Sequence, residues 1–389
     1  MLDERELEKA INSILSRLDV VNTLYIQKIA AQIRKIGELS PSSVNAMVEM
    51  LEMGANVAEI NQALQMATTL NAQEVYALYQ QVLNDTYTDT RFSAFLEDNP
   101  LPEPRRQRIT RYANAVARQT AGAMVNLSNT TITSQTYRNA IDLAILTVGS
   151  GVGDYKSAMR STIQQLGQAG MQVRYPSGYK RRLDTAVRQN IVDGAKQIAV
   201  QASFEIGEHL GFDAVELSAH ARPAPDHAPV QGRVFLNGDY QMMQIGSPFK
   251  DIDGRVYSGF RRPIGEWNCM HIPTPFSTEY SIRRFTPEQL DAFNEENEKG
   301  CVIGKKHYTT YQASQLMRQI ETQIRREKDT AVAAQAAGDD KLRADCQRRI
   351  STLAARYTMV SKVSGVGPRR NRMRVAGFKM VKLNATSPK

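Results

Sequence analysis

The first third of the chain is dominated by apolar residues that recur every three or four positions. Between residues 11 and 36 they are Ile11, Ile14, Leu18, Val21, Tyr25, Ile29, Ile33 and Ile36. Such steps place all of them on one helix face, so the pattern predicts a long amphipathic helix. Residues 40–43, which include Pro41, predict a helix stop and a new N-terminus. Two or three shorter helices are predicted next, over residues 44–54, 57–67 and 72–85.

The pattern changes near residue 170, where short alternating runs replace helical periodicity. Residues 171–183 alternate around a Pro-Ser-Gly turn and predict a short hairpin. A helix is predicted over residues 183–211, with Gly211 in the C-terminal capping role. Further strands are predicted among glycine-rich turns, at residues 212–220, 232–238 and 254–260. Nearly all of the predicted β-structure therefore lies between residues 170 and 285.

Helical periodicity returns after residue 285. Residues 311–337 and 341–363 each predict a long helix, and the Gly-Asp-Asp between them predicts a helical hairpin. Cys346 lies on the apolar stripe of the second helix, so it is interpreted as a small core residue. The predicted fold is α+β and predominantly helical, with a helical N-terminal module, a small mixed-β core, and a C-terminal helical hairpin with a basic tail.

These changes of pattern predict more than one domain, since 389 residues are too many for one ordinary domain. The first 100 residues hold 14 acidic and 7 basic residues and end in a proline-rich linker. The glycines of residues 148–154 are interpreted as a joint between helices. A phosphate-binding loop requires a preceding strand and a following Lys-Ser or Lys-Thr, and neither is clear here. The expected domains are an acidic helical module at 1–100, a core region at 101–285, and the hairpin with its tail at 286–389.

Composition narrows the classes of function. Hydrophobic residues make up 42% of the chain and charged residues 23%, which is close to globular averages. The three cysteines, at positions 269, 301 and 346, do not form a disulfide framework, which favours a reducing compartment. The N-terminus lacks the basic segment followed by an apolar segment that is typical of a signal peptide. The most apolar run is shorter than the roughly 18–20 residues that span a bilayer. We therefore expect a soluble, unsecreted protein without a membrane partner.

Rare side chains are concentrated in two short loops. The chain has five histidines and three cysteines, yet three of the histidines and one cysteine lie within residues 218–235 and 267–276. One interpretation is ordinary loop packing, with histidines hydrogen-bonded to the backbone. Another is a structural zinc ion, because four nitrogen and sulfur ligands from two loops suit a closed tetrahedral site. The candidate ligands are His220, His227, Cys269 and His271.

A third interpretation makes Cys269 a nucleophile. His220 or His227 would be its base, with Asp226 or Asn268 orienting the imidazole. A catalytic cysteine usually begins a helix, where the dipole lowers the pKa of the thiol. The two prolines that follow Cys269 do not favour a helix there, so the zinc site is the hypothesis we adopt.

The order of several motifs resembles a known family. They are GDYKSAMRSTIQQLGQAGMQVRYPSGYKRRLDTAVRQNI from residue 153, a His-Arg-Pro-His-Gln-Gly set in residues 220–232, WNCMH at 267–271, and the basic helical hairpin. Together they resemble the tailed-phage minor capsid protein 2 family, which is similar in turn to head-morphogenesis proteins of the phage Mu F type. Mapped onto this chain, the motif residues are Tyr155, Tyr175, Gly178, Arg188, His220, Arg222, Pro223, His227, Gln231, Gly232, Asn268, Cys269 and His271.

The resemblance implies a virion structural protein, present in few copies and acting in head assembly near the portal. Its implied partners are the portal protein and the major capsid protein. It is expected in the phage head, and in the host cytoplasm during assembly, without enzymatic activity or a small-molecule substrate. The alternative is a Cys-His peptidase or toxin-processing module associated with the phage head.

The final segment is strongly basic. Residues 362–389 contain eight Lys or Arg and no acid, in a chain of net charge +9. We expect this tail to be ordered only against a partner, either packaged DNA, through contacts that do not read sequence, or an acidic head protein. The alternative is a solvated chain end. The candidate binding residues are Arg369, Arg370, Arg372, Arg374, Lys379 and Lys382.

Overall fold

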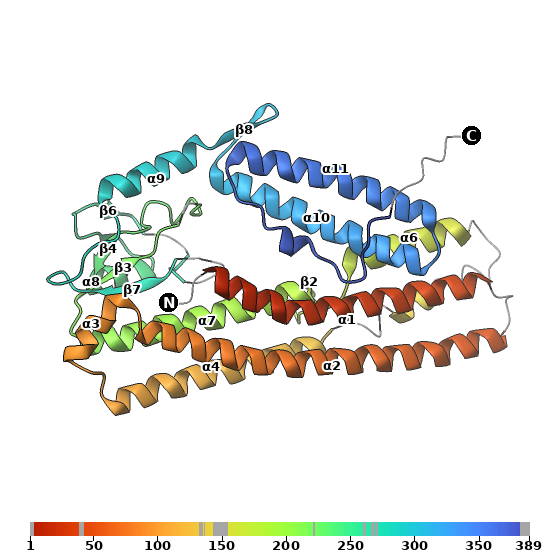
Figure 1. Cartoon of the computed structure of the whole chain (residues 1–389), viewed down its shortest axis with the longest axis horizontal. Coiled ribbons are helices and arrows are strands. Elements are labelled where there is room, and N and C mark those ends of the chain that lie inside the picture. The colour runs from red at the N-terminus through yellow and green to blue at the C-terminus, as the bar shows by residue number, and fades with distance from the viewer. Residues whose placement is uncertain are drawn as a thin grey trace.

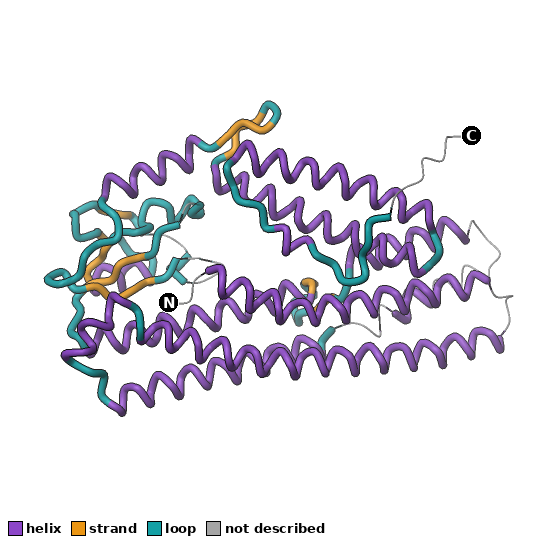
Figure 2. Tube along the Cα trace, viewed as in Figure 1, coloured by secondary structure: helices purple, strands orange, loops and turns teal. Residues whose placement is uncertain are grey.

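The computed structural model has an elongated helical body, and one group of short strands lies at one end of it (Figure 1, Figure 2). It is a predominantly helical α+β structure with small antiparallel sheets, which confirms the predicted fold class. The glycines at 148–154, Asn268 and Lys382 lie outside the described residues. The described residues are 4–38, 43–131, 135, 137–142, 155–220, 222–259, 262–265, 269 and 271–381.

Four long helices build most of the body: α1 (Glu4–Glu38), α2 (Ser43–Tyr87), α4 (Glu103–Asn129) and α7 (Leu183–His209). The helix predicted over residues 11–36 is confirmed, and all eight of its apolar positions are buried. The division of residues 44–85 into shorter helices is wrong, because α2 is one helix of 45 residues. Gly54 does not break it, since a helical glycine costs only about 1 kcal/mol and packing against α1 and α4 outweighs that cost.

A second layer holds α6 (Tyr155–Ala169) and the predicted hairpin of α10 (Thr310–Ala336) and α11 (Asp340–Ser364). Thr309 caps α10 and Asp339 caps α11, each by accepting a hydrogen bond from an amide in the first turn. α10 packs against α11, α6 and α1. Cys346 is buried in this layer, as predicted.

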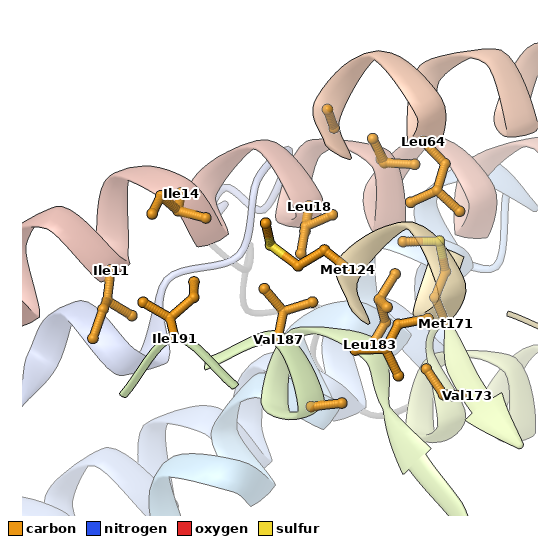
Figure 3. Close-up of a cluster of buried hydrophobic side chains, with 14 of the residues drawn as sticks. Ile11, Ile14, Leu18, Leu64, Met124, Met171, Val173, Leu183, Val187 and Ile191 are labelled. Carbon is orange, nitrogen blue, oxygen red and sulfur yellow. The ribbon is translucent and has the colours of Figure 1, made fainter. Parts of the chain in front are cut away.

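One continuous apolar cluster joins the two layers. In the part drawn in Figure 3, Leu18 of α1, Met124 of α4 and Val187 of α7 meet. The same cluster includes Val332 of α10 and Val375 near the C-terminus. Side chains from all three expected domains therefore share one core. The boundaries at residues 100 and 285 stay predictions, which limited proteolysis would test.

A small β unit (residues 212–285) lies at one end of the body (Figure 2). Its sheet places β3 (Ala214–Leu217) between β4 (Val234–Leu236) and β7 (Pro273–Phe276), each antiparallel to β3. Helix α8 (Asn237–Gln244) and a ribbon of β5 (Phe249–Lys250) and β6 (Val256–Tyr257) complete it.

The three strands predicted in this region are confirmed as β3, β4 and β6. β7 was not predicted, because its sequence is Pro-Thr-Pro-Phe and proline lacks the amide that a central strand needs. The prolines are tolerated because β7 lies at the edge of its sheet.

Close contacts seat the β unit on the body. A Cβ at Gly207 of α7 would lie 2.3 Å from the Cβ of Pro275 in β7, so a side chain there would clash. Phe212 packs against Phe92 and Phe95 of α3 (Thr90–Asp98). The remaining elements are β1 (Gln172–Arg174), β2 (Lys180–Arg182), α9 (Pro287–Lys299), β8 (Cys301–Ile303), β9 (Lys306–Tyr308) and the 3-10 helix η1 (Arg370–Met373).

The basic tail differs from its prediction. Up to residue 381 it is described, and it packs on the chain's own helices without a partner. The Ala376 amide donates to Asp19 of α1 over 2.6 Å, and the Thr23 hydroxyl donates to the Ala376 carbonyl over 2.8 Å. Apolar residues within the tail, such as Val375, allow it to join the core. Among the described helices, none combines the length and the apolar character needed to cross a bilayer.

Candidate metal centre

The loops that carry the rare histidines and cysteine meet beside the three-stranded sheet. Antiparallel pairing of β3 with β7 continues past the strand ends, because the Ser218 amide donates to the Ile272 carbonyl over 3.0 Å. The chain therefore runs from β3 toward His220 at the place where it enters β7 from Cys269 and His271. Strand pairing thus joins loops that are about fifty residues apart in sequence.

Three of the four predicted ligands form a buried cluster. The Sγ of Cys269 lies 3.3 Å from Nδ1 of His227 and 3.4 Å from Nδ1 of His271. One ligand atom from each residue lies within 4.8 Å of the other two. With Zn–S about 2.3 Å and Zn–N about 2.0 Å, sulfur and nitrogen are roughly 3.5 Å apart in a tetrahedral site. The two sulfur–nitrogen separations fit that geometry.

His227 presents the nitrogen that a metal ion needs. Its Nε2 lies 2.8 Å from the carbonyl oxygen of Arg262. A carbonyl can only accept, so Nε2 carries the proton and donates it, which leaves Nδ1 facing the Cys269 sulfur. Metal-binding histidines are commonly held in this way, with the second ring nitrogen bonded to an outer acceptor.

His271 contacts both the cysteine sulfur and the ring of His220. The Nε2 of His271 is buried and has no hydrogen-bond partner among the described residues. A buried polar atom in that state is costly unless a ligand, an ion or water satisfies it. The half-buried ring of His220 stands beside the His271 ring, with centroids 4.5 Å apart. His220 is therefore adjacent to the three-residue cluster rather than part of it.

Burial and charge favour the ligand forms of Cys269 and His271, whereas the contacts of His227 favour its protonated form, whose extra proton a metal ion would have to displace. Burial raises the pKa of the Cys269 thiol, but hydrogen bonds with His227 and with the backbone outweigh it and lower the pKa overall. Burial lowers the pKa of His227, whereas its contacts with Cys269 and the Arg262 carbonyl raise it overall. Burial and surrounding positive charge lower the pKa of His271 to about 2, so this ring is neutral at pH 7. A thiolate beside a neutral imidazole is what metal binding requires.

Two cations that the sequence did not single out hold the loops in place. Arg262 donates to the Asp226 carboxylate through Nε (2.9 Å) and Nη2 (2.8 Å), which fixes the carbonyl that orients His227. Lys196 of α7 donates from Nζ to the Cys269 carbonyl over 2.5 Å. Both are ordinary charged residues in sequence, and only the folded chain brings them to the cluster.

Gln231 and Gly232 of the motif support the first loop. Gln231 accepts a hydrogen bond from the His220 amide and donates one to Asn294 of α9, each over 3.0 Å. Gly232 has a φ of +68°, and a Cβ there would lie 2.3 Å from Leu290 of α9. Only glycine fits this position, so α9 holds the histidine loop from outside.

Other motif residues belong to the β1–β2 hairpin, to helices of the body and to the histidine loop. Tyr175 and Gly178 close the predicted hairpin of β1 and β2, where Gly178 has a φ of +82° and donates its amide to the Tyr175 carbonyl. Arg188 of α7 donates to Glu8 of α1 over 2.7 Å. The rest are Tyr155 at the start of α6, and half-buried Arg222 and buried Pro223 in the histidine loop.

Comparison with known protein families identifies the chain. The model of a family described as phage minor capsid protein 2 matches residues 2–359. The chain belongs to this family. The resemblance drawn from the motifs is thereby confirmed, and this minor capsid family member is a structural protein of phage virions. No curated protein and no solved structure matches it.

Proposed function

We propose that this minor capsid protein acts in head assembly near the portal, where it binds the portal protein and the major capsid protein. It is made in the host cytoplasm, is located in the phage head, and has no enzymatic activity, small-molecule substrate or membrane partner. Family membership supports this role. The elongated helical body supports it too, because its long faces offer a wide area for contacts with other head proteins (Figure 1).

A structural zinc ion stabilises the β unit in this proposal. The observation that carries it is the buried cluster of His227, Cys269 and His271, and His220, whose ring lies beside that of His271, is the proposed fourth ligand. The strands of the β unit have only two to four residues, so hydrophobic burial holds its loops weakly. A structural zinc contributes roughly 10–16 kcal/mol of apparent binding free energy in small proteins. That is enough to hold both loops.

A cysteine-dependent hydrolase is the second candidate function. Cys269 contacts His227, whose Nε2 lies 3.7 Å from the Asp226 carboxylate, in the order of nucleophile, base and orienting group. However, the Cys269 and His227 side chains are 2% and 0% exposed. A nucleophile must reach a substrate carbonyl, so this burial favours the structural role.

Metal analysis of the full chain, purified without chelator, tests the zinc site. About one zinc per chain is expected, and Cys269→Ala or His271→Ala should lose it. Cys346→Ala is the matched control, because Cys346 is also buried but lies in the helical hairpin, and its zinc content should equal that of the wild type. Wild-type protein without zinc would contradict the site.

Purified phage heads test the role in assembly. Cross-linking and mass spectrometry should join this protein to the portal protein, and cross-links only to distant head proteins would contradict the portal location. Phage carrying Cys269→Ser tests the hydrolase. Head proteins of unchanged size are expected, whereas cleaved products that disappear in the variant would establish the enzyme instead.

A further inference from the structure

The basic C-terminal segment is folded against the body. Residues 365–378 form what we call the C-terminal strap. It leaves α11 where the Arg369 amide donates to the Tyr357 hydroxyl over 2.8 Å. It then passes α10, where Nζ of Lys328 donates to the Met373 carbonyl over 2.6 Å, and ends on α1. In Figure 1 the strap is the dark blue stretch between the hairpin and α1.

Apolar side chains anchor the strap. Val366 and Val375 are buried, and each belongs to an apolar cluster of the body. Phe378 packs against the same clusters, and the Lys328 ammonium lies 5.3 Å from the centroid of its ring. The strap therefore has an inner apolar side, and its cations occupy positions fixed by that side.

The acids next to the strap are already engaged. Glu8 accepts from Arg372 over 3.1 Å and also pairs with a second arginine on α7. Asp19 accepts from a strap amide, and Glu321 of α10 accepts from the Tyr357 hydroxyl over 2.7 Å. These contacts engage Glu8, Asp19 and Glu321, and the strap arginine that pairs with Glu8 is Arg372.

Positive charge is left on the outer side of the strap. Arg370 and Arg374 are exposed, as is Lys379 directly after it, and none of the three pairs with a described acid. Arg318 of α10 stands close enough to Arg372 for their charges to interact. A surface with this much fixed positive charge is favourable for a polyanion.

We propose that the outer side of the C-terminal strap binds the phosphate backbone of double-stranded DNA. Arginine forks suit phosphate oxygens. The one aromatic residue of the strap, Phe378, packs inward. The strap therefore offers no exposed ring on which the bases of single-stranded DNA could stack. The inference rests on the virion location and not on the zinc site. The family match ends at residue 359, so the strap lies outside it.

Binding of the full chain to a duplex of arbitrary sequence, followed by fluorescence anisotropy at several salt concentrations, tests this surface. The variant carries Arg370→Gln, Arg374→Gln and Lys379→Gln. Each lost phosphate contact should lower the slope of log K against log salt by about 0.9, or roughly 2–3 for the three. Between about 50 and 200 mM salt the wild type should therefore lose roughly 40-fold more affinity than the variant.

The matched control removes the same charge elsewhere. Lys250, Lys299 and Lys305 are exposed in β5, α9 and the β8–β9 turn, and changing them to Gln should leave the slope as in the wild type. A strap variant with the wild-type slope, or equal losses in both triple variants, would overturn the proposal. Loss of binding to an acidic head protein with DNA binding intact would assign the strap to a protein partner instead. The strap variant should keep its zinc content and its presence in heads. A negative result for DNA binding would therefore leave the proposed function untouched.

Discussion

The helical body and the β unit are stabilised in different ways. In the body, helices of up to 45 residues bury one continuous apolar cluster with large side chains such as Tyr25, Tyr79 and Phe92. In the β unit, short strands enclose a small apolar cluster, and its buried interior also contains His227 and His271. Hydrophobic stabilisation grows with buried apolar area. The body is therefore stabilised mainly by its large buried apolar surface, whereas the β unit depends on a few specific polar contacts. We therefore expect the β unit and the helical body to unfold independently of each other.

Removing the proposed zinc ion should have the largest effect, and it should disrupt only the β unit. Chelation, or His271→Ala, should open residues 212–285 to protease, because the loss of roughly 10–16 kcal/mol exceeds what so small a core supplies. The helical circular dichroism of the body should persist. Proteolysis with mass spectrometry of the fragments measures this. Equal cleavage with and without chelator would mean that the β unit is stable by itself.

Ile29→Ala should show the opposite pattern. Ile29 is fully buried in α1, and the cavity left by truncation should lower the free energy of unfolding by about 2–5 kcal/mol. Urea unfolding followed by helical circular dichroism measures it, and zinc content should not change. Val20→Ala on the same helix is the control, because Val20 is 59% exposed and should cost less than about 0.5 kcal/mol. Zinc loss in Ile29→Ala would show that the two regions are coupled.

Gly207→Ala should loosen the junction between the two regions. The added Cβ would lie 2.3 Å from the Cβ of Pro275, and such overpacking costs about 1–3 kcal/mol. Zinc-loaded protein should then be cleaved faster in the β unit. Gly238→Ala in α8 is the control, because its Cβ would meet no atom within 4 Å. If both variants resist protease like the wild type, this contact does not hold the junction.

Loss of the negative charge of Asp89, at the same junction, should have the smallest effect on the free energy of unfolding. It caps α3 and pairs with Arg91, which donates to Thr274 of β7 over 2.8 Å. Burial raises the pKa of Asp89, but Arg91 and its amide outweigh burial and lower the pKa to about 2, against 3.8 for an unperturbed carboxyl. Because the folded pKa is the lower one, stability of about 2 kcal/mol is present above about pH 4 and is lost as pH falls toward 2.

Asp89→Asn isolates this contribution, because asparagine keeps a capping side chain without the charge. The difference in unfolding free energy between wild type and variant should shrink between about pH 5 and about pH 3. Urea titrations at each pH measure it, and acid loss of zinc affects both proteins alike. A difference that does not change with pH would assign no charge-dependent role to Asp89.

Sequence patterns predicted the fold best where one helix face is apolar. α1 and the α10–α11 hairpin follow directly from residues spaced by three and four. α2 was divided wrongly, because it is apolar on several faces and its periodicity does not mark its ends. The basic tail was also misjudged, because its charge concealed the apolar residues Val366 and Val375 that anchor it.

For the candidate site, the sequence by itself determined the residue types and the two loops that hold them. Histidine and cysteine are rare here, so their concentration near His227 and Cys269 stands out without a structure. Only the tertiary structure brought the two loops together, through antiparallel pairing of β3 with a proline-rich edge strand. It also decided which ring nitrogen of His227 faces the sulfur, because that depends on a carbonyl 35 residues away. Local spacing determines helices, whereas contacts between distant segments depend on how the whole core packs.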